Sequence, residues 1–145
     1  MSYIQQSKSS ALYVYIYDSL EKEATGEAGK WWLHNSLLKL QLSLKEKFNI
    51  NLIVIEGEAD PTIKGLIKKY NINEVIWNRL YSQKSINRDS VIKKSLQENN
   101  INVQTFNGHL LNEPWEVQNN SGQYFKVFTP YWRRAYEVYQ SKKYQ

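Results

Sequence analysis

Four short runs of β-branched and aromatic residues alternate with segments of helical periodicity, and this alternation restricts the fold more than any other feature of the chain. The runs cover residues 11–17, 51–55, 74–77 and 102–106. Most of them are continuously apolar, which favours strands that are buried on both faces of a parallel sheet. Strands joined by helical crossovers of this length predict a doubly wound, mostly parallel α/β sheet.

The segments between the runs carry apolar residues at steps of three and four, as one face of an amphipathic helix requires. In residues 31–48 this stripe is formed by Leu33, Leu37, Leu40, Leu44 and Phe48. In residues 86–99 it is formed by Val91, Ile92 and Leu96. Both segments are predicted to be helices that pack on the sheet. Trp31 and Trp32 are interpreted as core residues rather than as a stacking surface.

Start and stop signals indicate two further helices. Asp60-Pro61 combines an acidic N-cap with a proline at the first helical position, and Asn71 is the predicted stop. Residues 106–129 contain glycine, proline and paired asparagine, which predict a loop. Pro130 then opens a last helix over residues 131–144.

The composition excludes several classes of protein. A chain of 145 residues with 41% hydrophobic and 23% charged residues is typical of one globular domain. Its longest apolar stretch has seven residues, whereas a membrane span needs about 20. There is no cysteine for a disulfide, a thiolate metal site or a nucleophile. The first ten residues are polar, so no signal peptide is expected and a cytoplasmic location is predicted.

The formal charge of +5 is concentrated near the end of the chain. A basic segment can bind nucleic acid through its phosphates, and it can equally be a solvated surface. The nucleic-acid hypothesis involves Lys126, Arg133, Arg134, Lys142 and Lys143. The solvated surface is the preferred interpretation.

Ligands of such sheets bind at the carboxyl ends of the strands, which points to the turns that follow the four runs. Residues 26–30, GEAGK, could bind an anion through backbone amides and Lys30, but they match neither dinucleotide nor Walker motifs. An ordinary helix start is the alternative. His34 and His109 are far apart in the sequence, and His34 has no carboxylate at ligand spacing, so no metal site is predicted. No catalytic residue is predicted in the chain.

Five stretches then occur in a specific order. They are GEAGKWWLHNSL (26–37), VIWNRLY (75–81), RD (88–89), FNGHLLNEPWEV (106–117) and FKVFTPYWRRAY (125–136). Together they resemble the N-terminal, antenna-chromophore domain of the DNA photolyase/cryptochrome family, from about residue 11 to residue 136. The combination of NG-x-LL-x-EPWEV with FKVFTPYWR is especially specific.

The resemblance implies a Rossmann-like α/β domain over residues 1–115 and a connector with a helix over residues 116–145 that leads toward the family's FAD-binding domain. Family members are light receptors or lyases that repair cyclobutane pyrimidine dimers in DNA with light and reduced FAD. The FAD site, the DNA contact and the catalytic residues are expected outside this chain. The chain is therefore expected to be a light-harvesting domain that is inactive in repair alone. The alternative is a stand-alone module that binds a chromophore or nucleotide and partners a separate FAD domain.

The start of the chain departs from the resemblance. In the family's strand order 3-2-1-4-5 the first, central strand has no counterpart here, so residues 11–17 and 74–77 are expected to lack a shared neighbour. Three outcomes follow: these strands close on each other, another chain supplies the gap, or the fold is unstable. A homodimer could form by strand exchange or through the aromatic residues of 131–144.

The resemblance also implies an antenna site. The basic residue of deazaflavin-binding members matches Lys30, but their acidic positions fall on Leu80 and Ser82. The Asn-Glu pair of folate-binding members falls on Lys84 and Ser85. A flavin nucleotide is the third family chromophore, and the residues expected to line its site are Lys30, Asn78, Arg79 and Tyr81. Any of the three chromophores is expected to bind weakly, and the absence of a bound chromophore is the slightly favoured interpretation.

Overall fold

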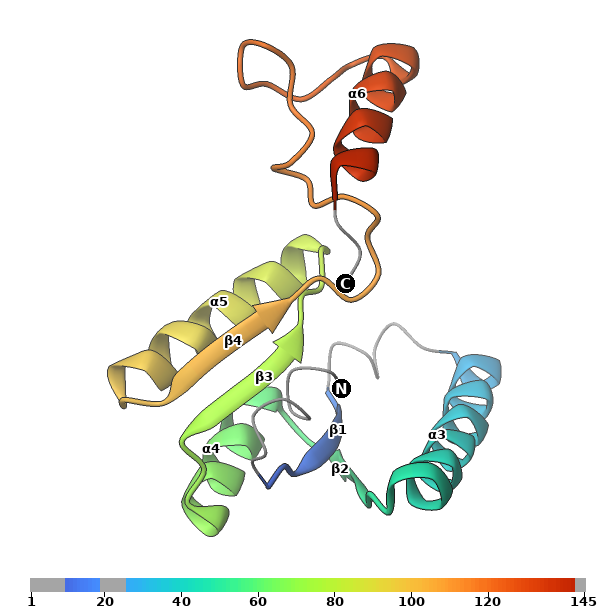
Figure 1. Ribbon diagram of the computed structural model, residues 1–145. Coiled ribbons are helices and arrows are strands. Elements are labelled where there is room, and N and C mark those ends of the chain that lie inside the picture. Colours follow the sequence, from blue (N-terminus) through green and yellow to red (C-terminus); the bar gives the residue numbers. More distant parts are fainter. Residues whose placement is uncertain (1–9, 19–25, 143–145) are drawn as a thin grey trace. The chain divides into compact units, whose positions relative to one another are not determined.

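A computed structural model describes residues 10–18 and 26–142 of the chain. Their elements follow the order β1 (Tyr13–Tyr17), α3 (Glu27–Phe48), β2 (Leu52–Glu56), α4 (Ala59–Tyr70), β3 (Glu74–Asn78), α5 (Gln83–Glu98), β4 (Asn102–Phe106) and α6 (Phe128–Ser141) (Figure 1). The predicted alternation of strands and helices is confirmed. The chain divides into two compact units, residues 1–73 and 74–145, which are described separately.

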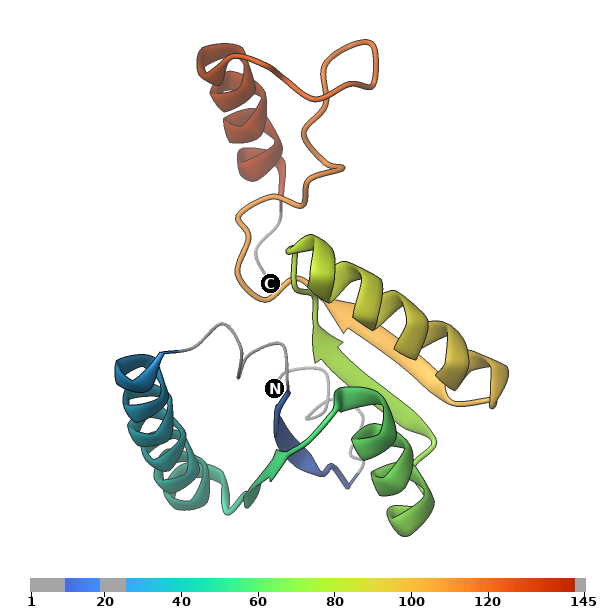
Figure 2. The ribbon, with the colours of Figure 1, turned by 180° about the vertical axis from the view of Figure 1, so that it is seen from behind.

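In the first unit, β1 and β2 form a parallel pair, with Tyr13 opposite Leu52 and Tyr17 opposite Glu56. Helices α3 and α4 lie on opposite sides of this pair in both views (Figures 1 and 2). Asp18 directly follows β1, is 4% exposed, and accepts a hydrogen bond of 3.3 Å from the Ala59 amide. A buried carboxylate thus fixes the end of β1 to the first turn of α4, where a negative charge also suits the helix dipole.

In the second unit, β3 and β4 form a parallel pair with Glu74 opposite Asn102. Helix α5 runs along this pair in both views (Figures 1 and 2) and packs on β4. Its residues Ile92 and Leu96, together with Val103 of β4, are buried and form the core of the unit. Residues 107–127 then lead to α6 without helix or strand.

The strands of the described residues form two parallel pairs, β1–β2 and β3–β4. In the predicted order 3-2-1-4-5 these pairs correspond to the two arms on either side of the central strand. The arrangement agrees with the expectation that residues 11–17 and 74–77 have no shared neighbour. The four predicted strands are therefore all present, each within two residues of its expected start.

All four helices of the described residues begin earlier than predicted. Helix α3 starts four residues before position 31, because Gly26 adopts an extended N-cap conformation and Glu27 occupies the first turn. Helices α4 and α6 place Pro61 and Pro130 at their third positions rather than at or before their first. The amides of a first turn have no helical partner, so a proline costs no hydrogen bond at any of these positions.

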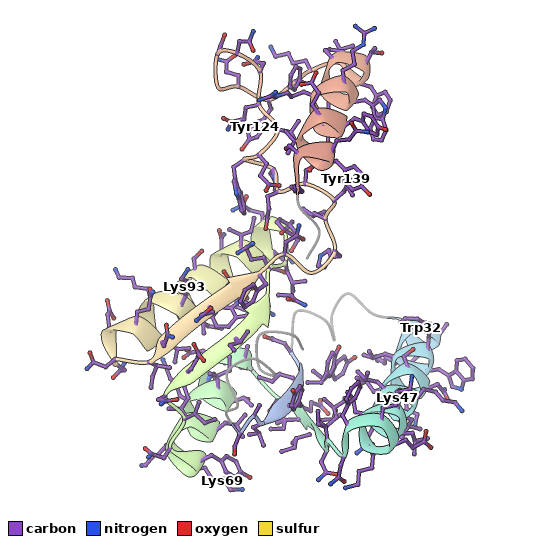
Figure 3. The ribbon with its side chains drawn as sticks, in the orientation of Figure 1. Trp32, Lys47, Lys69, Lys93, Tyr124 and Tyr139 are labelled. Carbon is purple, nitrogen blue, oxygen red and sulfur yellow. The ribbon has the colours of Figure 1, made fainter. Side chains whose placement is uncertain are left out.

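Some apolar residues predicted to face the core are exposed. Val91 is 67% exposed, because Ile92 and Leu96 face β4 and the neighbouring position points about 100° away. Trp31 and Trp32 are 70% and 66% exposed, which contradicts their interpretation as core residues; Figure 3 shows Trp32 near the amino-terminal end of α3. In the α3 stripe Leu44 is buried, whereas two other members, Leu40 and Phe48, are about half exposed.

Candidate functional site

The candidate site of the second unit lies where β3 and β4 end. Both strands are parallel, so the residues that follow them meet at one edge, which is the usual ligand side of such sheets. Asn78 ends β3, and Arg79 continues the ladder by donating its backbone N–H to the Phe106 carbonyl at 2.8 Å. Three of the four predicted site residues, Asn78, Arg79 and Tyr81, are brought to this edge.

The guanidinium of Arg79 is held by groups of its own unit. Its Nε donates to Glu113 Oε1 at 3.0 Å, and its Nη2 donates to the same oxygen. Its Nη1 donates to the carbonyl of Thr105 at 2.6 Å and to the Thr105 hydroxyl at 3.0 Å. The ring of Trp115 lies 5.5 Å from the guanidinium carbon. Burial opposes the charge, but interactions with Glu113 and Tyr81 outweigh it and raise the pKa of Arg79.

Glu113 is the centre of this network and is 5% exposed. Its Oε1 accepts the bonds from Arg79, and its Oε2 accepts a hydrogen bond of 2.7 Å from the Tyr81 hydroxyl. Reasoning from the sequence did not select Glu113 as a site residue. The signal that could have found it is its position in EPWEV, one of the motifs that carried the resemblance.

Tyr81 is a hydrogen-bond donor in this network. Burial, followed by the hydrogen bond to Glu113, raises the pKa of its hydroxyl, although Arg79 acts in the opposite direction. The phenol therefore keeps its proton at neutral pH. Its ring meets His109 edge to face, with centroids 5.7 Å apart.

Asn78 is exposed, and it lies against the turn after β4. A Cβ placed on Gly108 would come within 2.7 Å of the Asn78 amide carbon. The turn is shaped by Asn107, whose Oδ1 accepts from the Leu110 and His109 amides at 2.8 and 3.2 Å. Close approach of the two turns thus requires glycine at position 108.

The end of α6 is tied to the loop that carries Glu113. Lys142 donates to the Leu111 carbonyl at 2.9 Å and to the Glu116 carboxylate at 2.8 Å. Burial opposes ionisation of Glu116, but the hydrogen bonds from Lys142 and from the Glu113 amide, together with the positive charges of Lys142 and Arg79, outweigh it and lower the pKa of this carboxyl. Asn112 adds a third link by donating to the Ala135 carbonyl of α6 at 3.0 Å.

These contacts engage part of the predicted basic segment. Lys142 pairs with Glu116, and Arg134 pairs with Glu137 at 3.1 Å. Lys143 lies outside the described residues.

Lys30, the fourth predicted site residue, belongs to the first unit. It lies on α3, and its Nζ donates to Glu27 at 2.6 Å. The hydrogen bond with Glu27 raises the pKa of Lys30 and lowers the pKa of Glu27. Residues 26–30 thus form the cap and first turn of a helix, as the alternative interpretation of GEAGK expected.

Within residues 10–18 and 26–142, no group of three histidine, aspartate or glutamate side chains is placed to hold a metal ion. No helix in those ranges has both the length and the apolar character that crossing a membrane requires.

Parallel strands joined by helices, with polar side chains gathered where the strands end, define an α/β domain of the Rossmann-like class. Residues 4–145 match the family described as DNA photolyase. The chain belongs to the DNA photolyase family, which confirms the resemblance.

Known relatives include both branches of this family. A deoxyribodipyrimidine photo-lyase of Agrobacterium fabrum is 38% identical over 74% of this chain and 22% of its own length. Cryptochrome-2 and Cryptochrome-1 of Arabidopsis thaliana are 34% and 31% identical over 78% and 86% of this chain, and the match covers 18% of each.

A solved structure agrees with this assignment. The bacterial class III photolyase of Agrobacterium tumefaciens superimposes with a TM-score of 0.75 at 31% sequence identity. The superposition covers 93% of this chain and 27% of that protein. The chain thus spans about a fifth to a quarter of the proteins it resembles.

Proposed function

We propose that this chain is the antenna domain of a photolyase-family protein, which binds a light-absorbing chromophore and passes its excitation energy to FAD in another domain. The match over residues 4–145 carries this proposal. The matched residues make up only 22% of the Agrobacterium fabrum photo-lyase, and we assign FAD binding to a part of the family's fold outside this match.

The chromophore is a flavin nucleotide, a deazaflavin or a folate, and a flavin nucleotide is our first choice. Asn78 and Tyr81 of the second unit are the candidate contacts near the ends of β3 and β4, with Arg79 beside them. An exposed asparagine amide can donate to and accept from the amide groups of a flavin or pterin ring. Lys30, the remaining candidate, lies in the first unit, where it donates to Glu27, and we do not assign it to the site at the ends of β3 and β4.

Chromophore binding is tested by thermal melting of the chain with flavin mononucleotide, 8-hydroxy-5-deazaflavin or methenyltetrahydrofolate. A ligand that binds only the native state at 100 times its dissociation constant adds about 2.7 kcal/mol of stability. We expect one of the three to raise the melting temperature in a saturable way and to shift its own absorption band. No effect from any of them would contradict the proposal.

Repair itself is assigned to the FAD-binding domain, together with the contact to damaged DNA. We expect no loss of thymine dimers when the chain alone is illuminated with a dimer-containing oligonucleotide. A full-length photolyase of the family is the positive control. Light-dependent dimer loss with the chain alone would refute this assignment.

A stand-alone module that partners a separate FAD domain is the second candidate function. Its support is a row of aromatic side chains one turn apart on α6: Phe128, Trp132 and Tyr136 are 71%, 48% and 48% exposed. The rings of Phe128 and Trp132 are stacked with centroids 6.2 Å apart, and those of Trp132 and Tyr136 are tilted with centroids 6.0 Å apart. An exposed apolar surface of this kind is typical of a contact with a partner.

Size-exclusion chromatography with light scattering tests this candidate. The chain is mixed with a separately expressed FAD-binding domain of the family. A one-to-one complex that Trp132→Ala weakens would support the module, whereas a dimer of the chain alone would support self-association instead.

A further inference from the structure

We infer that Arg79 is a positioning residue: Glu113 holds its charge inside the second unit, and the edge formed by the ends of β3 and β4 recognises an uncharged part of the ligand rather than a phosphate. That a ligand binds at this edge rests on the proposed function. The internal role of Arg79 follows from the contacts of the unit itself.

The N–H donors of Arg79 already have acceptors within the second unit. A guanidinium has five N–H groups in a planar fork. Here Nε and Nη2 donate to Glu113, and Nη1 has both the carbonyl and the hydroxyl of Thr105 as acceptors. Four donor contacts are therefore made to Thr105, near the end of β4, and to Glu113, in the segment that follows β4. A ligand phosphate at this edge would have to compete with them.

A phosphate that drew Arg79 away would leave the carboxylate of Glu113 without its ion-pair partner. The Glu113 side chain is 6% exposed, against 32% for Arg79. Removing one partner of such a pair leaves a buried charge without compensation, which is strongly unfavourable. Withdrawal of Arg79 toward a phosphate would impose that penalty on Glu113, so the ion pair is favoured over the ligand contact.

Tyr81 is held by the same carboxylate as Arg79. Its hydroxyl donates to the second oxygen of Glu113 at 2.7 Å, so this phenol is also engaged within the unit. Arg79, Glu113 and Tyr81 thus form one network that joins the turn after β3 to the segment after β4. The neutral Asn78 amide, held against Gly108, is exposed at this edge, as are the neighbouring Leu80 and His109.

The ligand test compares flavin mononucleotide with riboflavin, which lacks the phosphate. We expect Arg79→Ala to lower the affinity for both flavins by the same factor and to leave their ratio within about twofold. Arg133→Ala, at an exposed position of α6, is the matched control and should change neither affinity. A tenfold greater loss of flavin mononucleotide than of riboflavin in Arg79→Ala would overturn the inference.

A second test needs no ligand. Urea unfolding compares the single variants Arg79→Ala and Glu113→Gln with the double variant. If the two residues act as one network, the urea midpoint of the double variant should be no lower than that of the less stable single variant. Additive losses would overturn the inference. Arg79→Lys replaces Arg79→Ala if the alanine variant does not fold, and lysine should not restore the network because it lacks the fork.

A spectroscopic signature separates this role from general support of the fold. Glu113 raises the pKa of the Tyr81 hydroxyl, so Glu113→Gln should lower that pKa in ¹³C NMR of ring-labelled tyrosine, with Tyr81→Phe identifying the signal. An unchanged Tyr81 pKa would overturn the inference. The unmodified chain could bind no flavin and still show the expected urea midpoints and the expected change in the Tyr81 pKa. In that case the proposed flavin ligand is wrong and the positioning role of Arg79 stands.

Discussion

Gly108 lies so near Asn78 that its α-carbon has room only for hydrogen. An added methyl group would meet the Asn78 side chain at 2.7 to 2.8 Å, well inside van der Waals contact. We expect Gly108→Ala to lower the free energy of unfolding by about 1–3 kcal/mol, as overpacking usually does. Urea unfolding followed by circular dichroism measures the change.

Gly65→Ala is the matched control for that substitution. A Cβ at this position of α4 meets nothing within 4 Å, and alanine is favoured over glycine in a helix interior by about 0.5–1 kcal/mol. The control should therefore gain stability. If both alanine variants shifted the midpoint in the same direction, the close approach at Gly108 would be refuted.

The Glu116–Lys142 pair makes stability depend on pH. The folded-state pKa of Glu116 lies below its ordinary value of 4.5, so in acid the unfolded chain binds its proton first. The contribution, about 1 kcal/mol for a partly exposed pair, is present above pH 4.5 and is lost as the pH falls through the folded-state pKa. Glu116→Gln should remove it.

Urea midpoints of the unmodified chain and of Glu116→Gln, measured from pH 3 to pH 7, test this prediction. The two should differ at pH 7 and converge in acid. Glu137→Gln, which breaks the more exposed pair with Arg134, should have little effect at any pH. A difference between the chain and Glu116→Gln that grew toward acid would contradict the assigned direction.

At the residue scale, the sequence predicted that Asn78, Arg79 and Tyr81 lie near one strand end. It also grouped Lys30 of the first unit with them, and it did not predict Glu113, the common partner of Arg79 and Tyr81. Asn78, Arg79 and Tyr81 follow one strand, so topology alone places them together. Glu113 is 34 residues from Arg79, and which acid pairs with a given arginine depends on the path of the intervening chain. Local pattern carries no information on that path.

At the scale of elements, α5 shows where capping decides a boundary. The helix begins at Gln83, three residues before the predicted start at 86, because the Ser82 hydroxyl accepts a hydrogen bond of 3.2 Å from the Ser85 amide. We expect Ser82→Ala to cost about 0.5–2 kcal/mol of unfolding free energy, measured by urea denaturation.

Ser90→Ala provides the control within the same helix. Ser90 is exposed in the interior of α5, where alanine is the better helix former, so this change should be neutral or slightly stabilising. Equal losses from both serine substitutions would argue against a capping role for Ser82.

Helix ends were predictable where a side chain or a special backbone conformation marks them. Asn71 was predicted to end α4, and it adopts the left-handed conformation with φ of 51° at the C-cap. Gly26 and Val127 cap α3 and α6 without a side-chain hydrogen bond, so these starts carried no comparable signal.

At the scale of the whole molecule, the charge of +5 predicts weak, salt-dependent binding to DNA. Five phosphate contacts would give a slope of about −4.5 for log affinity against log salt. Because Lys142 and Arg134 are ion-paired, we expect a slope of about −3 or shallower, measured by fluorescence anisotropy with duplex DNA.

Arg133→Ala should reduce that slope by about 1, since each phosphate contact contributes about 0.9. Lys142→Ala should leave it nearly unchanged. A slope as steep as that for five contacts would mean that the ion pairs open on DNA, and the solvated-surface interpretation would then fail.

The class of fold and the family were predictable because the alternation of strands and helices and the ordered motifs extend along most of the chain. The parallel pairing of β1 with β2 and of β3 with β4 agrees with the predicted parallel sheet, but the sequence left open whether residues 11–17 and 74–77 would close on each other. Exposure of Trp31 and Trp32 did not follow, because two adjacent tryptophans carry no information on which face of α3 meets other residues.

The link between Arg79 and Glu113 has a consequence for the order of folding. It closes a loop of 34 residues and requires that β4 already lie beside β3, itself a pairing between residues 28 apart. Loop-closure entropy disfavours such contacts until the chain between them is organised, whereas α5 can form from local interactions alone. The strand-end network is thus expected to form late, after the transition state. Its loss would speed unfolding far more than it slows folding.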